Sequence, residues 1–387
     1  MKKLGLLGVV VLCTSLGLHN GARISPTPLI EEFRLRYAVD YAGVGAVIGA
    51  YTLSYAFAQL VAGLLSDRVG NRRLIQAGLL VMAVGSGVFA VTSDPALALA
   101  GRLVMGVAGG LLYVPSLSYM LNAYGPSERG KAMGLAQGGA GATIVLSILA
   151  MPPLFLVVGL TGAYAVYPLA ALLLWLGVVY VIPNVEPPSR ASGGSLLVLA
   201  RDGQFWLLFL GFAFVGMLAQ TAVLSWMPTY LRQQFGLGVA EAGAAGALVA
   251  AGLMVFSPTF GLLADRLGSH LRVMLMGSLI GLLGFVILAV ANSWWLAIVA
   301  GLLVSAGMAA TITLQIVFAG ERFAAVGAGT AVALVNTGGQ LSQSLDGPFY
   351  GTILDLGFGF TGVWSVAVAL GIVRVIAVLL LREERPC

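Results

Sequence analysis

Charge is scarce in this sequence. Only 9% of its 387 residues are charged, against the roughly 25% of a typical soluble domain, and the mean hydropathy is +0.99. A chain of this composition cannot cover a folded core with polar surface, which excludes a water-soluble globular protein. The isoelectric point near 9.3 does not indicate a nucleic-acid partner, because lysine is rare and the arginines are spread among short loops.

Cysteine and catalytic motifs are also scarce. The two cysteines are Cys13, inside the first apolar run, and Cys387, the last residue, so we expect no structural disulfide. No Gly-Lys-Ser/Thr phosphate loop occurs, since Lys131 follows a glycine but precedes Ala132. The sequence also lacks a nucleophile with a base, paired carboxylates and a metal-ligand cluster. We therefore expect no enzyme, no cofactor and no metal.

Long apolar runs fill the sequence instead. Each is long enough to cross a hydrocarbon core of about 30 Å, and none alternates with the period of two that a membrane β-barrel needs. We therefore expect an all-α membrane protein with twelve transmembrane helices. The expected helices are 4–30, 41–65, 74–92, 96–120, 131–158, 163–182, 203–230, 240–263, 273–291, 294–318, 327–354 and 361–381.

The loops between these segments indicate orientation and domain organisation. The loops of one side hold most of the basic residues, whereas those of the other side hold only Arg34, Arg36 and Arg232. The positive-inside rule therefore predicts that both termini are cytoplasmic. Residues 183–202 are rich in proline, glycine and serine, as in a linker. We expect one six-helix bundle at 1–182 and a second at 203–387, forming a monomer among the lipids of the plasma (inner) membrane.

A short sequence occurs at corresponding places in the two halves. Gly63–Gly70 reads GLLSDRVG, and Gly261–Gly268 reads GLLADRLG. The pair Glu128–Arg129 before the fifth helix likewise recurs as Glu321–Arg322 before the eleventh. Internal duplication of this kind is typical of carriers that work by alternating access.

Over essentially its whole length the sequence resembles the major facilitator superfamily. The first copy of the repeated loop follows the motif of that family between helices two and three, and Arg102 resembles its fourth-helix arginine. The second copy departs from the motif, because Ser269 and His270 stand where basic residues are usual. The fifth helix lacks the Gly-Pro pair of drug/proton antiporters. The resemblance implies gating roles for Gly63, Asp67, Arg68, Gly70, Arg72, Arg73, Glu128, Arg129, Asp265 and Arg266.

The residues of the first loop have expected physical roles. Asp67 follows the second helix, where a carboxylate can face the N-terminus of a neighbouring helix and pair with an arginine. Gly63 permits a close approach of helices, and Gly70 permits a tight turn. The alternative is an ordinary positive-inside loop without a gating role.

A further similarity points to the anion-transporting branches of the family, such as the anion:cation symporters. Arg23 lies about where organic-anion symporters carry a first-helix arginine, and Trp226–Leu231 resembles the end of their seventh helix. Ala22 stands where an acidic residue often precedes that arginine. This similarity implies an anionic substrate.

Ionisable residues inside the expected helices are few, because each costs at least about 2.5 kcal/mol at the centre of a membrane helix. Arg23, Arg102 and Asp346 all fall in the outer half of their helices and together indicate a positively charged cavity suited to an anion. Asp346 and His19 are the candidates for proton coupling. Three alternatives are open: Arg102 ties helices together through carbonyls, Asp346 caps a broken helix, and His19 is a structural histidine. We expect Arg374 to extend toward the membrane surface.

Polar side chains on the expected cavity-lining helices complete the candidate substrate site. Amide and aromatic groups also bind helices to one another, so each is a weak signal alone. The expected substrate-binding residues are Arg23, Asn20, Arg102, Tyr113, Gln137, Gln220, Trp226, Gln315, Asn336 and Gln340, with Tyr51 and Thr311 nearby.

The sequence predicts a secondary active transporter for a small anion, such as a carboxylate or an inorganic anion, with protons as the coupling ion. An alternative is export of amphipathic, hydrophobic or lipid-like compounds, for which Arg23 would be dispensable. A third function is that of a receptor without turnover. Exchange of a labelled solute across the membrane would exclude the receptor.

Overall fold

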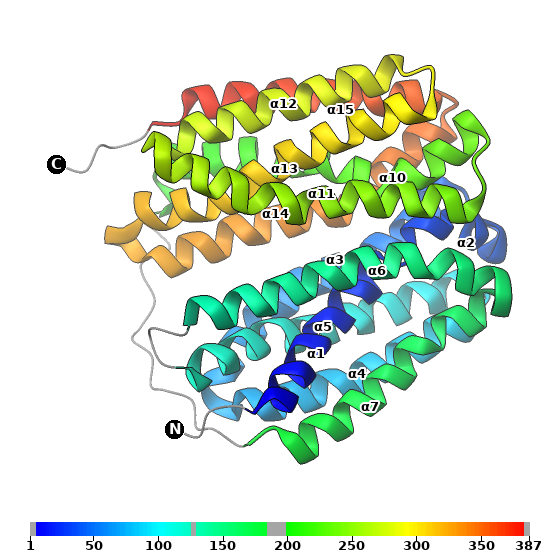
Figure 1. Ribbon diagram of the computed structural model, residues 1–387, viewed down its shortest axis with the longest axis vertical. Coiled ribbons are helices and arrows are strands. Elements are labelled where there is room, and N and C mark those ends of the chain that lie inside the picture. The colour runs from blue at the N-terminus through cyan, green and yellow to red at the C-terminus, as the bar shows by residue number, and fades with distance from the viewer. Residues whose placement is uncertain (1–4, 125–128, 184–198, 383–387) are drawn as a thin grey trace. The chain divides into compact units, whose positions relative to one another are not determined.

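The computed structural model describes residues 5–124, 129–183 and 199–382, and these form helices joined by short turns (Figure 1). No strand occurs among the described residues, which confirms the all-α class. The chain divides into two compact units. Unit 1 comprises Met1–Val39 and Ala46–Ala191, and unit 2 comprises Asp40–Gly45 and Ser192–Cys387.

Unit 1 is built mainly from the helices of the first half of the chain. Its first long helix is interrupted, and the last is the shortest of its apolar helices. The elements are α1 (Leu6–Ile24), η1 (Thr27–Leu29), α2 (Ile30–Tyr37), α3 (Tyr41–Val69), α4 (Asn71–Val91), α5 (Pro95–Ala123), α6 (Arg129–Tyr164) and α7 (Val166–Val181). Helix α3 begins in unit 2 and continues in unit 1 from Ala46.

Unit 2 holds the helices of the second half. Its first membrane helix contains a stretch of π-helix, labelled η2. The elements are α9 (Gly203–Trp206), η2 (Leu207–Phe214), α10 (Val215–Phe235), α11 (Val239–Leu267), α12 (His270–Val290), α13 (Trp294–Arg322), α14 (Ala324–Asp355) and α15 (Gly359–Leu380).

The same helix pairs pack in both units. In unit 1, α4 packs against α5 and α7, and α1 packs against α6. In unit 2, the corresponding α12 packs against α13 and α15, and α10 packs against α14 (Figure 1). The duplicated sequence motif is therefore accompanied by a repeated packing arrangement within each unit.

The helices have the length and apolarity that membrane crossing requires. Ten spans of the described residues are long and apolar enough to cross, and α7, with 16 residues, is a shorter apolar helix. Every segment expected from the sequence coincides with helical structure. The number of twelve crossings and the cytoplasmic location of both termini remain predictions.

The first expected helix, 4–30, lies within one candidate membrane span, Leu6–Tyr37, but it is not one continuous helix. Helix α1 ends at Ile24, a short 3-10 turn follows, and α2 begins at Ile30. Pro26 and Pro28 lack a main-chain N–H and restrict the residue before them, so the helical ladder cannot run through this segment. The two prolines could have predicted the break, but the continuous apolar run favoured a single helix.

Helix α9 and the end of α15 contact each other through one side chain. The amide nitrogen of Gln204, in α9, donates to the main-chain oxygen of Leu380 at 3.4 Å. Its amide oxygen accepts from the main-chain N–H of Arg382 at 2.8 Å. Helix α15 is thereby fastened to α9.

Candidate functional site

Arg102 closes the break in the first helix. Its side chain is fully buried on α5 and donates to the main-chain oxygens of Ala22 at 2.7 Å and Arg23 at 2.9 Å, and to that of Ile48 on α3 at 3.1 Å. The last four carbonyls of a helix lack partners within the helix, and the helix C-terminus carries partial negative charge. Arg102 therefore supplies both hydrogen bonds and charge where α1 ends.

This arrangement supports the structural alternative for Arg102. Its guanidinium also lies over the ring of Tyr51, 4.6 Å from the centroid. A guanidinium held by three carbonyls and a ring has few donors left for a solute. A direct contact between Arg102 and a substrate remains a prediction.

An aromatic cluster surrounds His19 in unit 1. His19, on α1, is 1% exposed, and its ring lies 4.6 Å from that of Tyr55 and 5.7 Å from that of Tyr113, measured between centroids. The hydroxyl of Tyr51 lies 2.9 Å from Nδ1 of His19 and donates to the main-chain oxygen of His19 at 3.1 Å. Gly109 on α5 makes room for the imidazole, because a Cβ there would lie 2.4 Å from Nδ1.

The other expected unit 1 residues border this cluster. Arg23 lies one helical turn after His19 and is in electrostatic range of His19, Tyr51 and Tyr55. Its side chain is half-buried. The exposed amide of Gln137, on α6, donates to the hydroxyl of Tyr113 at 3.1 Å. The structure thus places a cation, an amide and several aromatic rings together on four helices.

Asn20 takes a different position. Its amide donates to the main-chain oxygen of Leu16 in the same helix at 3.1 Å, and the side chain is buried. This contact uses one of the two N–H donors of the amide, and it does not test the expected ligand role of Asn20. That role remains a prediction.

The unit 2 candidates form a second polar group. The hydroxyl of Thr311, on α13, donates to the side-chain oxygen of Gln220, on α10, at 3.3 Å. Gln315 is 4% exposed, and no described residue bonds its side-chain oxygen. Asn336 and Gln340 lie on α14 and are half-buried. The four expected substrate-binding residues Gln220, Gln315, Asn336 and Gln340 therefore lie on the three helices α10, α13 and α14 of one unit.

Trp226 is fully buried on α10, and its indole N–H has no partner among the described residues. Its ring lies 6.2 Å from that of Tyr41 at the start of α3, in an edge-on arrangement. A buried aromatic donor without a partner is unusual, because indole N–H groups are generally hydrogen-bonded when buried. Trp226 thus remains a candidate for contact with a solute.

Asp346 is buried on α14, in unit 2. It is 2% exposed, and its Oδ1 has no hydrogen-bond partner among the described residues. The hydroxyls of Thr221 and Ser225, on α10, interact with its carboxyl group. Arg23 and Arg102 belong to unit 1 and Asp346 belongs to unit 2, and their expected grouping in one cavity stays a prediction.

Arg374 does not extend to the membrane surface as expected. It is 2% exposed on α15, it donates to the main-chain oxygen of Gly216 at 3.2 Å, and its guanidinium lies 4.3 Å from the centroid of Phe212. Its Nε and Nη2 have no partner among the described residues. Gly216 lacks the Cβ that would come within 2.9 Å of this side chain, so the helix leaves space for a buried arginine.

The start of α3 crosses α14 at glycines of unit 2. A Cβ on Gly347 would lie 2.3 Å from the main-chain oxygen of Gly45, and a Cβ on Gly351 would lie 2.4 Å from that of Tyr41. Gly347, Gly351 and Asp355 recur at intervals of four and share one face of α14. The small residues let the two main chains touch.

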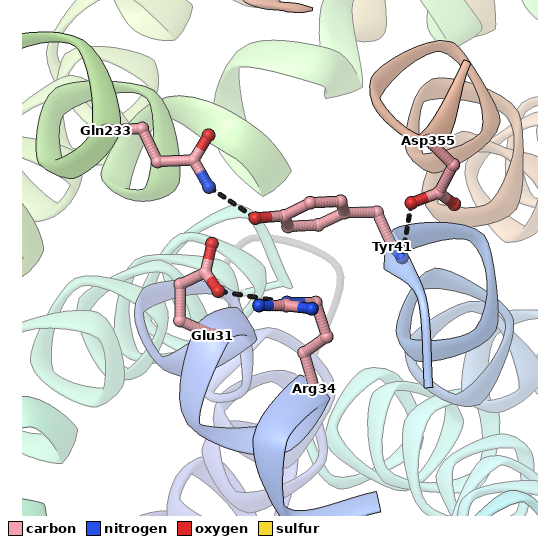
Figure 2. A network of polar contacts seen from close by, with 5 residues as sticks. All are labelled: Glu31, Arg34, Tyr41, Gln233 and Asp355. Atoms are coloured by element: carbon pink, nitrogen blue, oxygen red, sulfur yellow. Dashed lines mark hydrogen bonds and ion pairs between the residues drawn. The ribbon is translucent and has the colours of Figure 1, made fainter. Parts of the chain in front are cut away.

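Asp355 completes this crossing with a carboxylate cap. Its Oδ1 accepts from the main-chain N–H of Tyr41 at 2.9 Å, and its Oδ2 accepts from that of Ala42 at 2.8 Å. Figure 2 shows Tyr41 between Asp355 and Gln233, whose amide donates to the Tyr41 hydroxyl. The first N–H groups of a helix lack partners within the helix and attract negative charge. The carboxylate therefore fastens the N-terminus of α3 within unit 2.

The gating candidates of the first loop are partly described. Gly70 has a φ of +89° between α3 and α4, as the expected tight turn requires. The Nη2 of Arg72 donates to the main-chain oxygen of Val179 at 2.6 Å, near the end of α7. Among the described residues, the nearest atom to a Cβ on Gly63 would be in Val114, at 3.9 Å, and the expected close approach at Gly63 stays a prediction.

Other gating candidates are exposed or lie outside the described part of the chain. Arg68, Arg73, Asp265 and Arg266 are exposed at helix ends. Glu128 lies outside the described residues, as do the side chains of Asp67 and Arg129. In the second half, Glu321 lies 3.2 Å from Nδ1 of His270, which forms an ion pair when that histidine is protonated. The histidine that departs from the motif thus still has an acidic partner.

Sequence reasoning missed two residues of these sites. Tyr55 was not singled out because it lies in an apolar helix, although its spacing of four from Tyr51 places both on one face of α3. Asp355 lies at a helix end, where an acidic residue is common and does not by itself indicate a site. Its partner is 313 or more positions away in the chain, so no local pattern indicates the contact.

Comparison with known proteins agrees with this architecture. The family model of the Major Facilitator Superfamily matches residues 7–252 and 213–387. The chain is 29% identical to a 3-(3-hydroxy-phenyl)propionate transporter of Escherichia coli K12, over 100% of this chain and 96% of that protein. It is 25% identical to a rice protein named probable anion transporter 2, chloroplastic, over 74% of this chain and 57% of that one.

The fold is also found among solved structures. A bacterial homologue of the human lysosomal transporter Spinster superposes with a TM-score of 0.77. The match covers 96% of this chain and 94% of the other at 17% identity. At this identity the similarity shows the fold alone.

Proposed function

Because this chain belongs to the Major Facilitator Superfamily, we propose that it is a secondary transporter which carries a small aromatic carboxylate by alternating access, coupled to protons. The chain is a multi-pass membrane transporter and not an enzyme. The plasma (inner) membrane is its proposed location, and a monomer is its proposed state. Lipids and the solute are its proposed partners.

The observation that carries this proposal is the cluster of unit 1, where Arg23 borders several aromatic rings. A carboxylate is the natural partner of a guanidinium, because charge-assisted hydrogen bonds are about twice as strong as neutral ones. The rings of Tyr55 and Tyr113 offer edge-on and stacked packing to an aryl group. The relative that transports 3-(3-hydroxy-phenyl)propionate supports the same class of solute.

Uptake into proteoliposomes tests the substrate. We expect labelled 3-(3-hydroxyphenyl)propionate to accumulate under an imposed pH gradient, and we expect the Arg23→Gln change to lower its affinity by about tenfold or more, since a charged hydrogen bond contributes about 1.5–3 kcal/mol. Arg34→Gln is the matched control, because Arg34 is in the same unit and pairs with Glu31 at 3.1 Å on a partly exposed surface (Figure 2). It should transport normally.

Two results would contradict the proposed substrate or the proposed role of Arg23. Uptake that is equal in the wild type and in the Arg23 variant would remove the assigned role of Arg23. If the wild type takes up no aryl carboxylate, and both proteins protect cells from hydrophobic compounds, the chain is an exporter of amphipathic solutes.

Asp346 is the residue that we propose for proton coupling, with His19 as the second candidate. An ionised carboxylate is costly to bury, and the described groups that bond to Asp346 are the hydroxyls of Thr221 and Ser225. In Asp346→Asn, we expect accumulation driven by the pH gradient to fall to the level set by exchange, while counterflow of labelled for unlabelled solute continues.

Asp94→Asn provides the control for this change. Asp94 caps α5 by accepting from the N–H groups of Ala96 and Leu97, and asparagine caps helices equally well. It should leave both activities intact. Full gradient-driven accumulation by Asp346→Asn would show that the coupling proton binds elsewhere.

A further inference from the structure

A groove in unit 2 opens at one end of the membrane helices. It has a volume of about 570 Å³ and is lined by the first turns of α11 and α13 and by the turn that joins α10 to α11. Gly236, in that turn, has a φ of +70° and no side chain, and Ala244 and Ala245 carry only a methyl group. These small residues leave the space open, and we call it the α11–α13 groove.

The α11 side of this groove changes from charged to apolar along the helix. Glu241, Ala244 and Leu248 follow one another at intervals of three and four, so they form a stripe on one face of α11. All three are exposed, and α11 is long and apolar enough to cross a membrane. The stripe therefore begins with a carboxylate at the membrane boundary and continues as apolar surface toward the hydrocarbon core.

The α13 side has the same order of polar and apolar groups. Trp294 is the first residue of α13 and is 50% exposed, and Ile298 lies one turn further along. A tryptophan at a membrane boundary keeps its ring in apolar surroundings and directs its N–H toward lipid headgroups. Both helices begin at this groove, so the polar groups of Glu241 and Trp294 lie at the same end of it. A lipid has the same order, with a headgroup followed by an acyl chain.

The carboxylate of Glu241 is held in place by the turn. Its Oε2 accepts from the main-chain N–H of Gly238 at 3.0 Å. A carboxylate can accept about four hydrogen bonds, so Glu241 can accept a further donor. Among the described residues that line the groove, Glu241 alone is charged. Charge complementarity therefore favours a cationic group with N–H donors.

We propose that the α11–α13 groove binds one membrane lipid whose headgroup carries a primary ammonium group, as in phosphatidylethanolamine. The ammonium donates to Glu241, the indole N–H of Trp294 donates to a phosphate or ester oxygen, and one acyl chain lies along Leu248 and Ile298. The occupant is a lipid and not a free amine, because the apolar lining continues from the carboxylate into the membrane-spanning part of α11. This inference does not depend on which solute is transported.

Quenching of tryptophan fluorescence tests this site. Purified full-length protein is reconstituted in vesicles of phosphatidylglycerol with either phosphatidylethanolamine or phosphatidylcholine, both brominated on the same acyl chains. The contribution of Trp294 is the signal that Trp294→Phe removes. We expect phosphatidylethanolamine to compete for the site beside Trp294 at least about threefold more strongly than phosphatidylcholine, because choline has no N–H to donate.

Trp295 provides the control for the position of the site. It is 58% exposed and lies next to Trp294, but it is outside the lining of the groove. The signal that Trp295→Phe removes should show no preference between the two lipids. Total quenching of the wild type by each lipid keeps the test informative if a tryptophan variant fails to fold.

Glu241→Gln separates the charge from the helix cap. Glutamine still accepts from the N–H of Gly238, but the negative charge is gone, so we expect the preference at Trp294 to fall to about one. Ala244→Phe fills the groove and should remove the preference as well. Asp94→Asn is the matched control, because Asp94 is an exposed carboxylate that caps α5 in unit 1, and this variant should keep the preference of the wild type.

Three results would overturn the proposal. Equal quenching of Trp294 by the two lipids in the wild type would mean that the groove does not select a headgroup. An undiminished preference in Glu241→Gln would mean that its carboxylate does not bind the ammonium. If Trp294 is shielded from both lipids, and Ala244→Cys forms a disulfide-linked dimer that the wild type does not form, the occupant is a second copy of the chain.

Discussion

Replacing Arg102 by methionine should abolish transport and lower the free energy of unfolding by about 2–4 kcal/mol. The change removes three hydrogen bonds from a buried side chain and leaves the final carbonyls of α1 without donors. Lipid supplies no replacement donors, so the interruption at Pro26 and Pro28 would lose what holds its upstream end. Thermal unfolding of the purified protein, measured with solute uptake, checks this.

Arg374→Met is the matched control for this prediction. Both arginines are buried and lie over an aromatic ring, but among the described residues Arg374 donates to Gly216 alone, and two of its nitrogens lack partners there. Removing a poorly paired buried charge is often neutral or stabilising. We therefore expect a smaller change in melting temperature than for Arg102→Met.

Comparison of the two arginine variants also shows whether Arg102 contacts the solute or holds the end of α1. A melting temperature of Arg102→Met equal to that of the wild type, together with lost solute binding, would mean that Arg102 contacts the solute and does not hold the helix. Equal destabilisation in both variants would mean that the pairing with carbonyls is unimportant.

Substituting Gly347 by alanine should reduce transport by at least about tenfold. The added methyl would lie 2.3 Å from the main-chain oxygen of Gly45, and main-chain atoms cannot move aside as flexible side chains do. Overpacking of this kind typically costs about 1–3 kcal/mol, and here it would push the start of α3 away from the Asp355 carboxylate. Uptake and thermal unfolding are the measurements.

Gly339→Ala, on the same helix, is the control. A Cβ there would have its nearest neighbour, in Met217, at 3.5 Å, which is ordinary contact. Alanine also favours helix over glycine, so we expect normal transport and equal or higher stability. Normal transport by Gly347→Ala would show that the crossing can open by the width of a methyl group without loss of function.

The helices were predictable because lipid imposes a simple rule on sequence. Each apolar run of sufficient length has to be helical, and the twelve expected segments all coincide with helical structure. The break after Ile24 was readable from Pro26 and Pro28, but hydropathy alone favoured a continuous helix. The π-helical stretch at Leu207–Phe214 has no comparable signal, because its residues are as apolar as those of an α-helix.

The sequence indicated which residues belong to the candidate site better than it indicated which of them contact one another. Buried arginines stood out in the sequence because ionisable groups are rare in membrane helices. Whether a guanidinium faces a solute or carbonyls depends on helices far apart in the chain, and the 80 positions between Arg102 and Ala22 hide their contact. Likewise, the motif directed attention to Gly63, whereas main chains approach one another closely at other glycines, such as Gly106 and Gly347.

The two hydrogen bonds that Gln204 makes, to Leu380 and to Arg382, bear on whether the order of the helices along the chain can be permuted. Where the first and last helices of a unit end beside one another, the packing depends on the cyclic order of the helices and not on which of them is synthesised first. A second half that is joined between Arg382 and Gln204 and opened at another of its turns is therefore expected to keep the contacts among α10 to α15. Gene fusion and circular permutation act on this kind of freedom.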